Sequence, residues 1–125
     1  MNKNMLVLAY LGDSIYEVYI RKYLVNKGIS KVKELQSESI KYVSAKSQCA
    51  YIKELINSSL LNEEEIGIVK CARNHKNNHK PKNCDIITYN WATGFEALIG
   101  YLYLEDKIDR IEEIINYITS ERIDK

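Results

Sequence analysis

The sequence predicts an all-α fold, arranged as a single helical bundle. Apolar residues recur at the three- and four-residue spacing of helices through most of the 125 residues. No run alternates apolar and polar residues as a half-buried strand would. The chain contains one proline and five glycines, too few for the many turns of an all-β fold. We expect one domain, residues 1–125, which is long enough to bury a core.

Three helices are expected in the first half of the chain, each with a recognisable end. The first stops before Gly28, because glycine readily adopts the left-handed conformation that ends a helix. Ser30 and Ser44 are good N-caps for the next two, since a serine hydroxyl accepts a hydrogen bond from a free backbone N–H group. These helices are expected at 5–26, 31–43 and 45–57.

Three more helices are expected in the second half. Asn62, followed by three glutamates at the positive end of the helix dipole, marks the start of the first of them. The next is apolar almost all round, with Glu96 as its one charged residue, which is typical of the central helix of a bundle. The last presents four isoleucines to the core. The helices are expected at 63–74, 87–104 and 110–123, with Ile111, Ile114, Ile115 and Ile118 inward in the last.

Composition gives expectations for partners and compartment. A net charge of +1 points to no partner, so a nucleic-acid signal has to come from local clusters of charge. The three cysteines are an odd number without disulfide-type spacing, which suits a reducing cytoplasm. Asp13 interrupts the first apolar run, so no leader is evident, and every apolar stretch is too short for a membrane span. We expect a cytoplasmic protein without a membrane partner.

The first helix carries two carboxylates within an otherwise apolar stripe. Asp13 and Glu17 lie one turn apart, and a half-buried carboxylate is costly unless a metal, a cation or several hydrogen bonds satisfy it. The alternative is that Asp13 is a structural residue that caps a helix or forms an ion pair. By helical spacing the stripe consists of Leu6, Tyr10, Asp13, Glu17, Ile20 and Leu24.

A second isolated carboxylate, Glu96, also has small neighbours. Thr93 and Gly100 lie three residues before and four residues after it, and Gly12 lies beside Asp13. Small residues on two helices allow a close crossing, so we expect Asp13 and Glu96 to face each other. Two carboxylates from different helices suit Mg²⁺, which binds oxygen ligands and can activate water for attack on a phosphodiester.

Residues 70–83 form a basic segment that contains no acid. Clustered lysine and arginine are typical of a phosphate-binding surface, although a solvated loop could carry them for solubility alone. Both histidines and two cysteines lie in or beside this segment, so a zinc site that stabilises an interaction module is an alternative. The spacing fits no established zinc motif. The zinc candidates are Cys71, His75, His79 and Cys84.

Several motifs resemble those of the ribonuclease III family. The segment LAYLGDSIYE (8–17) resembles the family's signature helix, and FEALIGYLYLE (95–105) resembles its second acidic motif. Between them, RNHK, PKN and YNWATG resemble the Mini-III branch, whose members lack a double-stranded-RNA-binding domain. The order and separation of these motifs in a chain this short make the resemblance specific.

This resemblance implies an all-helical endonuclease that acts as a homodimer on double-stranded RNA. It implies Mg²⁺-dependent cleavage that leaves a 5′-phosphate, with precursor 23S ribosomal RNA of bacteria as the substrate. Asp13 and Glu96 match the family's catalytic, metal-binding acids. Lysine and asparagine in the basic segment suit the phosphates and hydroxyls of A-form RNA. The implied RNA-binding residues are Arg73, Lys76, Lys80, Lys82 and Asn83.

The chain departs from the usual ribonuclease III pattern at two positions. Ala9 and Thr93 stand where most members carry a glutamate and an aspartate. Glu17 could join the metal site in compensation, or it could pair with Arg21 one turn later. The two missing carboxylates support an alternative function, in which a catalytically silent domain binds structured RNA as a scaffold.

The basic segment gives a first testable prediction. Replacing Lys76 and Lys80 together by alanine should weaken RNA binding and flatten its salt dependence, because fewer counterions are released on binding. The dissociation constant measured at several salt concentrations checks this. A salt slope equal to that of the wild type would remove the segment from the RNA interface.

Overall fold

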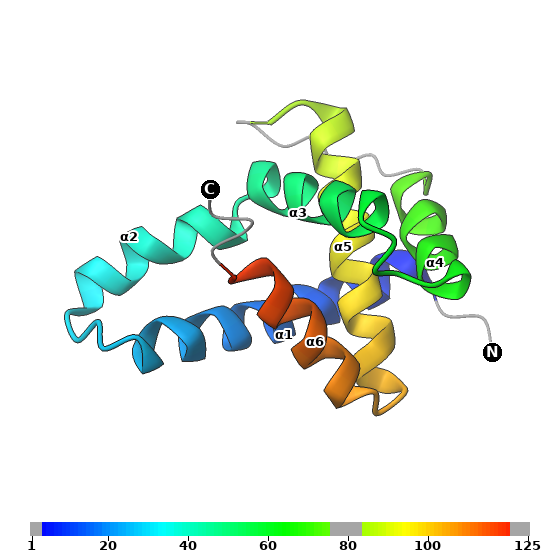
Figure 1. Cartoon of the computed structure of the whole chain (residues 1–125). Coiled ribbons are helices and arrows are strands. Elements are labelled where there is room, and N and C mark those ends of the chain that lie inside the picture. The colour runs from blue at the N-terminus through cyan, green and yellow to red at the C-terminus, as the bar shows by residue number, and fades with distance from the viewer. Residues whose placement is uncertain (1–3, 76–83, 121–125) are drawn as a thin grey trace.

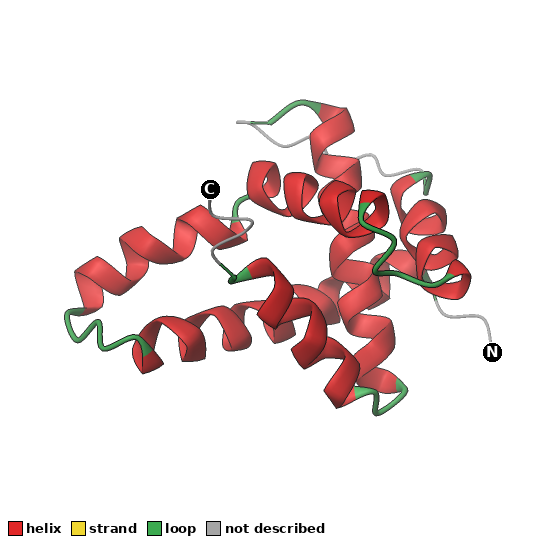
Figure 2. Cartoon of the chain, viewed as in Figure 1, coloured by secondary structure: helices red, strands yellow, loops and turns green. Residues whose placement is uncertain are grey.

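The computed structural model describes residues 4–75 and 84–120, and this part of the chain forms six α-helices and no strand (Figure 2). The predicted all-α fold is confirmed. In chain order the helices are α1 (Met5–Asn26), α2 (Val32–Val43), α3 (Ala45–Asn57), α4 (Glu63–Arg73), α5 (Ile86–Leu104) and α6 (Ile108–Ile118). α5 runs through the middle and contacts α1, α3, α4 and α6, as expected for the central helix (Figure 1).

Side chains cap four of the helices where the sequence provides suitable residues. At the start of α1, Asn4 Oδ1 accepts a hydrogen bond from the Leu6 N–H group (2.8 Å). Ser44 Oγ accepts a hydrogen bond from the Ser47 N–H group at the start of α3 (3.2 Å). At the start of α4, Asn62 Oδ1 accepts from the Glu65 N–H group (2.8 Å), and Glu65 Oε1 accepts from the Asn62 N–H group (2.9 Å). The Asp85 side chain caps α5. Local hydrogen bonds thus fix where these helices begin.

The ends of four helices differ from the prediction: α4 ends and α5 begins one residue earlier than expected, and α2 and α6 differ as follows. α2 begins at Val32 after Lys31, which supplies no side-chain cap, so Ser30 is not the N-cap. α6 begins at Ile108 because this residue packs against the core and continues the apolar spacing by one turn. It ends at Ile118, earlier than expected.

The core lies where α5 faces α1, α3 and α6. Tyr16 and Phe95 are fully buried and meet edge to face, with their ring centroids 4.8 Å apart. The four isoleucines of α6 that were expected inward are all buried, which confirms the core-facing side of that helix.

A nearly buried ion pair joins α6 to the first turn of α4. Arg110 Nε lies 2.8 Å from Glu65 Oε2, and Arg110 Nη2 donates both to Glu65 Oε1 (2.8 Å) and to Leu60 O (2.6 Å). Burial opposes ionisation of Glu65, but the hydrogen bonds from Arg110 hold the pKa of this carboxyl group below its usual range. One guanidinium group therefore fixes α6, the start of α4 and the connection that precedes α4.

α1 and α5 cross with their backbones in contact. A Cβ atom at Gly12 would collide with Glu96 O and lie 2.8 Å from Gly100 N, and a Cβ atom at Gly100 would collide with Leu8 O. Neither position has room for a side chain, so the close crossing expected from the small residues is present. Because of this crossing, Asp13, which follows Gly12, lies next to the turn of α5 that contains Glu96.

The buried face of α1 agrees with the stripe expected from the sequence only at Ile20 and Leu24. Tyr10 is 83% exposed, and Asp13 is exposed as well. The helix is rotated so that its small residues face α5, and apolar patterning gives little weight to alanine and glycine. The buried residues of α1 are Leu8, Ala9, Gly12, Tyr16, Ile20 and Leu24.

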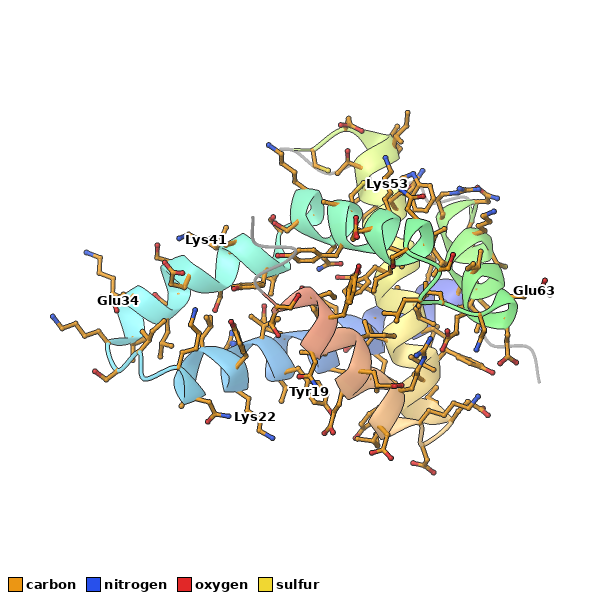
Figure 3. All side chains as sticks on the ribbon, in the orientation of Figure 1. Tyr19, Lys22, Glu34, Lys41, Lys53 and Glu63 are labelled. Carbon is orange, nitrogen blue, oxygen red and sulfur yellow. The ribbon has the colours of Figure 1, made fainter. Side chains whose placement is uncertain are left out.

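Charged side chains such as Glu34, Lys53 and Glu63 are exposed to solvent on the outside of the bundle (Figure 3). Among the described residues, no helix combines the length and the apolar character needed to span a bilayer.

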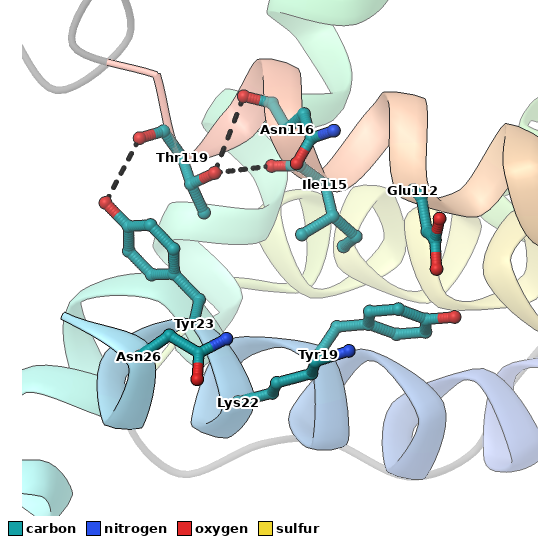
Figure 4. Close-up of a pocket in the computed structure, with 8 residues that line it drawn as sticks. All are labelled: Tyr19, Lys22, Tyr23, Asn26, Glu112, Ile115, Asn116 and Thr119. Carbon is teal, nitrogen blue, oxygen red and sulfur yellow. Dashed lines mark hydrogen bonds between the residues drawn. The ribbon is translucent and has the colours of Figure 1, made fainter.

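α6 and α1 enclose a shallow hollow of about 260 Å³ between them (Figure 4). The Tyr23 hydroxyl donates to Thr119 O across it (3.3 Å) and ties the end of α6 to α1. Glu112 is the one carboxylate among the described residues that line this hollow, so these residues offer no group of acids for a metal ion.

Candidate active site

Asp13 of α1 and Glu96 of α5 lie side by side, with a hydrogen bond between their carboxyl groups. Asp13 is exposed and Glu96 is partly buried. Both carboxyl groups therefore reach a hollow of about 220 Å³ at the crossing of the two helices. The hollow is lined by Leu6, Ala9, Tyr10, Asp13, Tyr89, Thr93 and Glu96.

The Glu96 carboxyl group holds its proton more tightly than an ordinary glutamate, because its pKa is raised. Burial, the negative charge of Asp13 and the hydrogen bond with Asp13 raise the pKa of Glu96 to about 8, against the opposing effect of a hydrogen bond from Gln48. Without a cation, Glu96 therefore stays protonated at neutral pH. A divalent cation between the two groups would favour loss of this proton, because its charge stabilises both ionised forms.

Gln48 of α3 is a residue of this site that the sequence reasoning missed. It is 2% exposed, and its Nε2 atom donates to Val43 O (3.0 Å) and to Glu96 Oε2 (3.3 Å). Its Oε1 atom is buried without a hydrogen-bond partner among the described residues. The available signal was a polar residue on the face of α3 that also presents Ile52 and Leu55 to the core.

Comparison with known proteins decides the family. A model of the ribonuclease III domain matches residues 6–107, a range that includes both carboxylates. The chain belongs to the ribonuclease III family. Its relatives include the Mini-ribonuclease 3 of Brevibacillus brevis, 48% identical over 90% of this chain and 82% of the relative. The Mini-ribonuclease 3 of Enterococcus faecalis is 46% identical over 91% of this chain and 86% of the relative.

A solved structure supports the same assignment. The crystal structure of a protein from Fusobacterium nucleatum is 39% identical and superposes with a TM-score of 0.84 over 93% of both chains. The fold is thus that of the ribonuclease III domain, and the relatives confirm the Mini-III branch that the motifs indicate. As a member of this family, the chain is an endoribonuclease.

The two departures from the usual ribonuclease III pattern both line the carboxylate hollow. The Thr93 hydroxyl donates to Tyr89 O, one turn earlier in its own helix (3.0 Å), and Ala9 has no polar side-chain atom. Neither residue brings a charge to the hollow. Among the residues that line this hollow, Asp13 and Glu96 are therefore the carboxylates, and the other two positions carry none.

Glu17 is not brought together with the other two acids. Its Oε1 atom lies 3.0 Å from Arg21 Nη2, which is the ion pair weighed as the alternative to metal binding. Glu17 lines the groove between α1 and α2, not the carboxylate hollow. A role for Glu17 as a metal ligand stays a prediction.

Arg73 is the one RNA-binding candidate that lies within the described residues. The centre of its guanidinium group is 4.7 Å from the centre of the Trp91 ring, and Lys53 Nζ is 5.5 Å from the same ring. Two cations therefore gather where α4 ends and the basic segment begins. The other candidates, Lys76, Lys80, Lys82 and Asn83, lie outside the described residues.

The donor atoms at the crossing fit a hard divalent cation. Two carboxyl groups from facing helices provide oxygen ligands, and the exposed side of the hollow leaves room for water and a phosphate oxygen, as Mg²⁺ requires. Within residues 4–75 and 84–120, no three His, Cys, Asp or Glu side chains come together as a metal site. Of the zinc candidates, Cys71, His75 and Cys84 form no such group there, and His79 lies outside the described residues.

Proposed function

We propose that this endoribonuclease cleaves double-stranded RNA with Mg²⁺ held by Asp13 and Glu96. The observation that carries the proposal is the meeting of two carboxylates from different helices across a crossing too close for side chains. Among the described residues, no lysine, arginine or histidine lines the hollow that they share, so no basic residue of this part of the chain compensates their charge there. An acid pair of this kind costs stability, which is typical of a functional site.

The residues have distinct tasks in this reaction. When bound, Mg²⁺ would supply a nucleophilic water and stabilise the leaving oxygen of the phosphodiester. Asp13, which is exposed, and Glu96, which is partly buried, would together hold the ion through their carboxylate oxygens. Glu96 would release its proton to water when the ion binds.

We also propose that the enzyme is a homodimer. The groove between α1 and α2 has a volume of about 400 Å³ and is lined mainly by apolar side chains. Val25, Val32 and Ile40 are 55%, 67% and 63% exposed at its edges. An exposed apolar patch of this kind is typical of a protein interface. A second copy would supply a second pair of carboxylates, one pair for each RNA strand.

Precursor 23S ribosomal RNA in the bacterial cytoplasm is the substrate that we propose, with 5′-phosphates on the products. This finer assignment is supported by the resemblance of the RNHK, PKN and FEALIG motifs to the Mini-III branch. The similarity to proteins named Mini-ribonuclease 3 over most of the chain supports it as well.

The direct test is incubation of the purified protein with a long RNA duplex, in Mg²⁺ or in EDTA. We expect the duplex to be shortened only in Mg²⁺, because the two carboxylates need the ion to act on a phosphodiester. Single-stranded RNA of the same sequence and duplex DNA are the controls and should remain intact. Digestion of the products by an exonuclease that requires a 5′-phosphate would identify the ends.

The silent scaffold is the second candidate function, and Ala9 and Thr93 favour it. A scaffold would bind the RNA duplex equally well with and without Mg²⁺ and would leave it uncut. That behaviour in a folded wild-type protein would overturn the proposed activity.

A further inference from the structure

Gln48 connects Glu96 to the corner between α2 and α3. We propose that Gln48 is a positioning residue, which holds the Glu96 carboxyl group in the orientation that binds the divalent cation. This inference rests on the proposed function and adds a residue that lies outside the LGDS and FEALIG motifs.

The carbonyl group of Val43 fixes which way the Gln48 amide points. The atom 3.0 Å from Val43 O must be the nitrogen, because a carbonyl oxygen can only accept a hydrogen bond. The same nitrogen lies 3.3 Å from Glu96 Oε2 and carries a second hydrogen for it. A flipped amide would set two oxygens against each other at Val43. Gln48 therefore presents a donor to Glu96, whose Oε2 atom accepts.

This donor restricts the carboxyl group that would bind the metal. A glutamate side chain loses rotamer freedom when it is fixed, and this loss otherwise weakens metal binding. With Oε2 tied to Gln48 and the same carboxyl group hydrogen-bonded to Asp13, Glu96 is already oriented before an ion arrives. Partners that orient a metal ligand in this way raise its affinity for the ion.

The backbone to which the amide is anchored is itself held. The Ser47 hydroxyl donates to Lys41 O (2.7 Å), and the Tyr16 hydroxyl donates to Tyr42 O (2.8 Å). These hydrogen bonds satisfy carbonyl groups in the last turn of α2, immediately before Val43. Gln48 thus holds the Glu96 carboxyl group in a fixed position relative to the corner between α2 and α3.

The amide oxygen of Gln48 argues against a role in packing alone. It is buried without a partner among the described residues, and an unsatisfied buried acceptor lowers stability. An apolar side chain of similar length would avoid this cost. Packing alone therefore does not favour glutamine at this position, whereas donation to both Val43 O and Glu96 does.

Gln48→Met tests the inference, because methionine keeps the length of the side chain and removes the donor. Isothermal titration calorimetry without RNA should show a Mg²⁺ dissociation constant raised about 10-fold or more. At saturating Mg²⁺, kcat should change by less than about threefold and KM for the RNA should stay the same, because the effect acts through the occupancy of the metal site. If the Gln48→Met variant does not fold, the same measurements are made with Gln48→Leu.

Ile52→Val is the matched control. Ile52 is fully buried one turn further along the same face of α3, and the loss of one methyl group there should lower stability without changing Mg²⁺ affinity. Equal Mg²⁺ affinity in the wild type and a folded Gln48 variant would overturn the inference and leave the proposed function standing. Loss of the fold in both Gln48 variants would give Gln48 a structural role and overturn it too. A wild-type protein that binds no Mg²⁺ would overturn both.

Discussion

Asp13→Asn and Glu96→Gln should each slow cleavage of double-stranded RNA by at least about 10³-fold, because a bound metal ion supplies several kcal/mol of transition-state stabilisation. Each substitution keeps the shape of the side chain and removes a charge that the ion needs. Neither residue is part of the buried core, so the fold should persist. Single-turnover cleavage of a long duplex at saturating Mg²⁺ measures the rates.

Glu17→Gln, one turn after Asp13, completes this comparison. Because Glu17 pairs with Arg21, we expect activity near that of the wild type. A loss as large as that of Asp13→Asn would instead add Glu17 to the metal site. Unimpaired cleavage by either the Asp13 or the Glu96 variant would remove that residue from the site.

The Glu96→Gln variant should also be more stable than the wild type when no metal is present. A glutamate of the unfolded chain loses its proton near pH 4.5, whereas folded Glu96 keeps its proton to about pH 8. The stability of the wild type therefore falls as the pH rises between these values, by up to about 1.4 kcal/mol per pH unit, and glutamine does not titrate. Urea unfolding in EDTA at pH 5 and pH 8 should show a gap between the two proteins that widens with pH. A constant gap would mean that folded Glu96 does not retain its proton.

Gly100→Ala should destabilise the protein by about 3 kcal/mol or more and abolish cleavage. The new carbon would collide with Leu8 O and lie 2.9 Å from Leu8 C, and these backbone atoms cannot rotate away as a side chain could. α1 and α5 would have to separate, which would loosen the core and move Asp13 away from Glu96. Urea unfolding and the duplex cleavage assay measure the two effects.

Gly67→Ala is the matched control for this substitution. Gly67 lies inside α4 and is exposed, and a Cβ atom there would have nothing within 4 Å. The same chemical change should therefore raise stability by about 0.5–1 kcal/mol, because alanine has less backbone freedom to lose on folding. Wild-type stability in Gly100→Ala would contradict the contact between the two helices.

The positions of the helices could be predicted because their signals are local. α1 and α3 begin and end at the expected residues, since capping and apolar spacing involve neighbours within a few positions. The predicted start of α2 was wrong, because Ser30 is a suitable capping residue but the helix begins without a side-chain cap. A good capping residue shows where a helix can begin, and packing decides whether it does.

The candidate site could be predicted only in part. Asp13 and Glu96 each stand out as a carboxylate beside small residues, so their meeting could be inferred from the close crossing that small residues allow. The rotation of α1 could not be predicted, because the contact of this helix with α5 is made by alanine and glycine, which carry little hydrophobic signal. The role of Gln48 could not be predicted either, since it depends on a hydrogen bond to Glu96, 48 positions away in the sequence.

The ion pair between Arg110 and Glu65 helps to fix the distance between the basic segment and the two carboxylates. It holds the first turn of α4, while Val69, further along α4, lies directly against Gly94 of α5. The basic segment begins at Lys70, in the last turn of the same helix, which ends at Arg73. The place where that segment begins is thus set by two rigid contacts and not by the segment itself. If an RNA duplex binds to the basic segment and is cut at Asp13 and Glu96, the helical bundle fixes the distance between the bound part of the duplex and the bond that is cut.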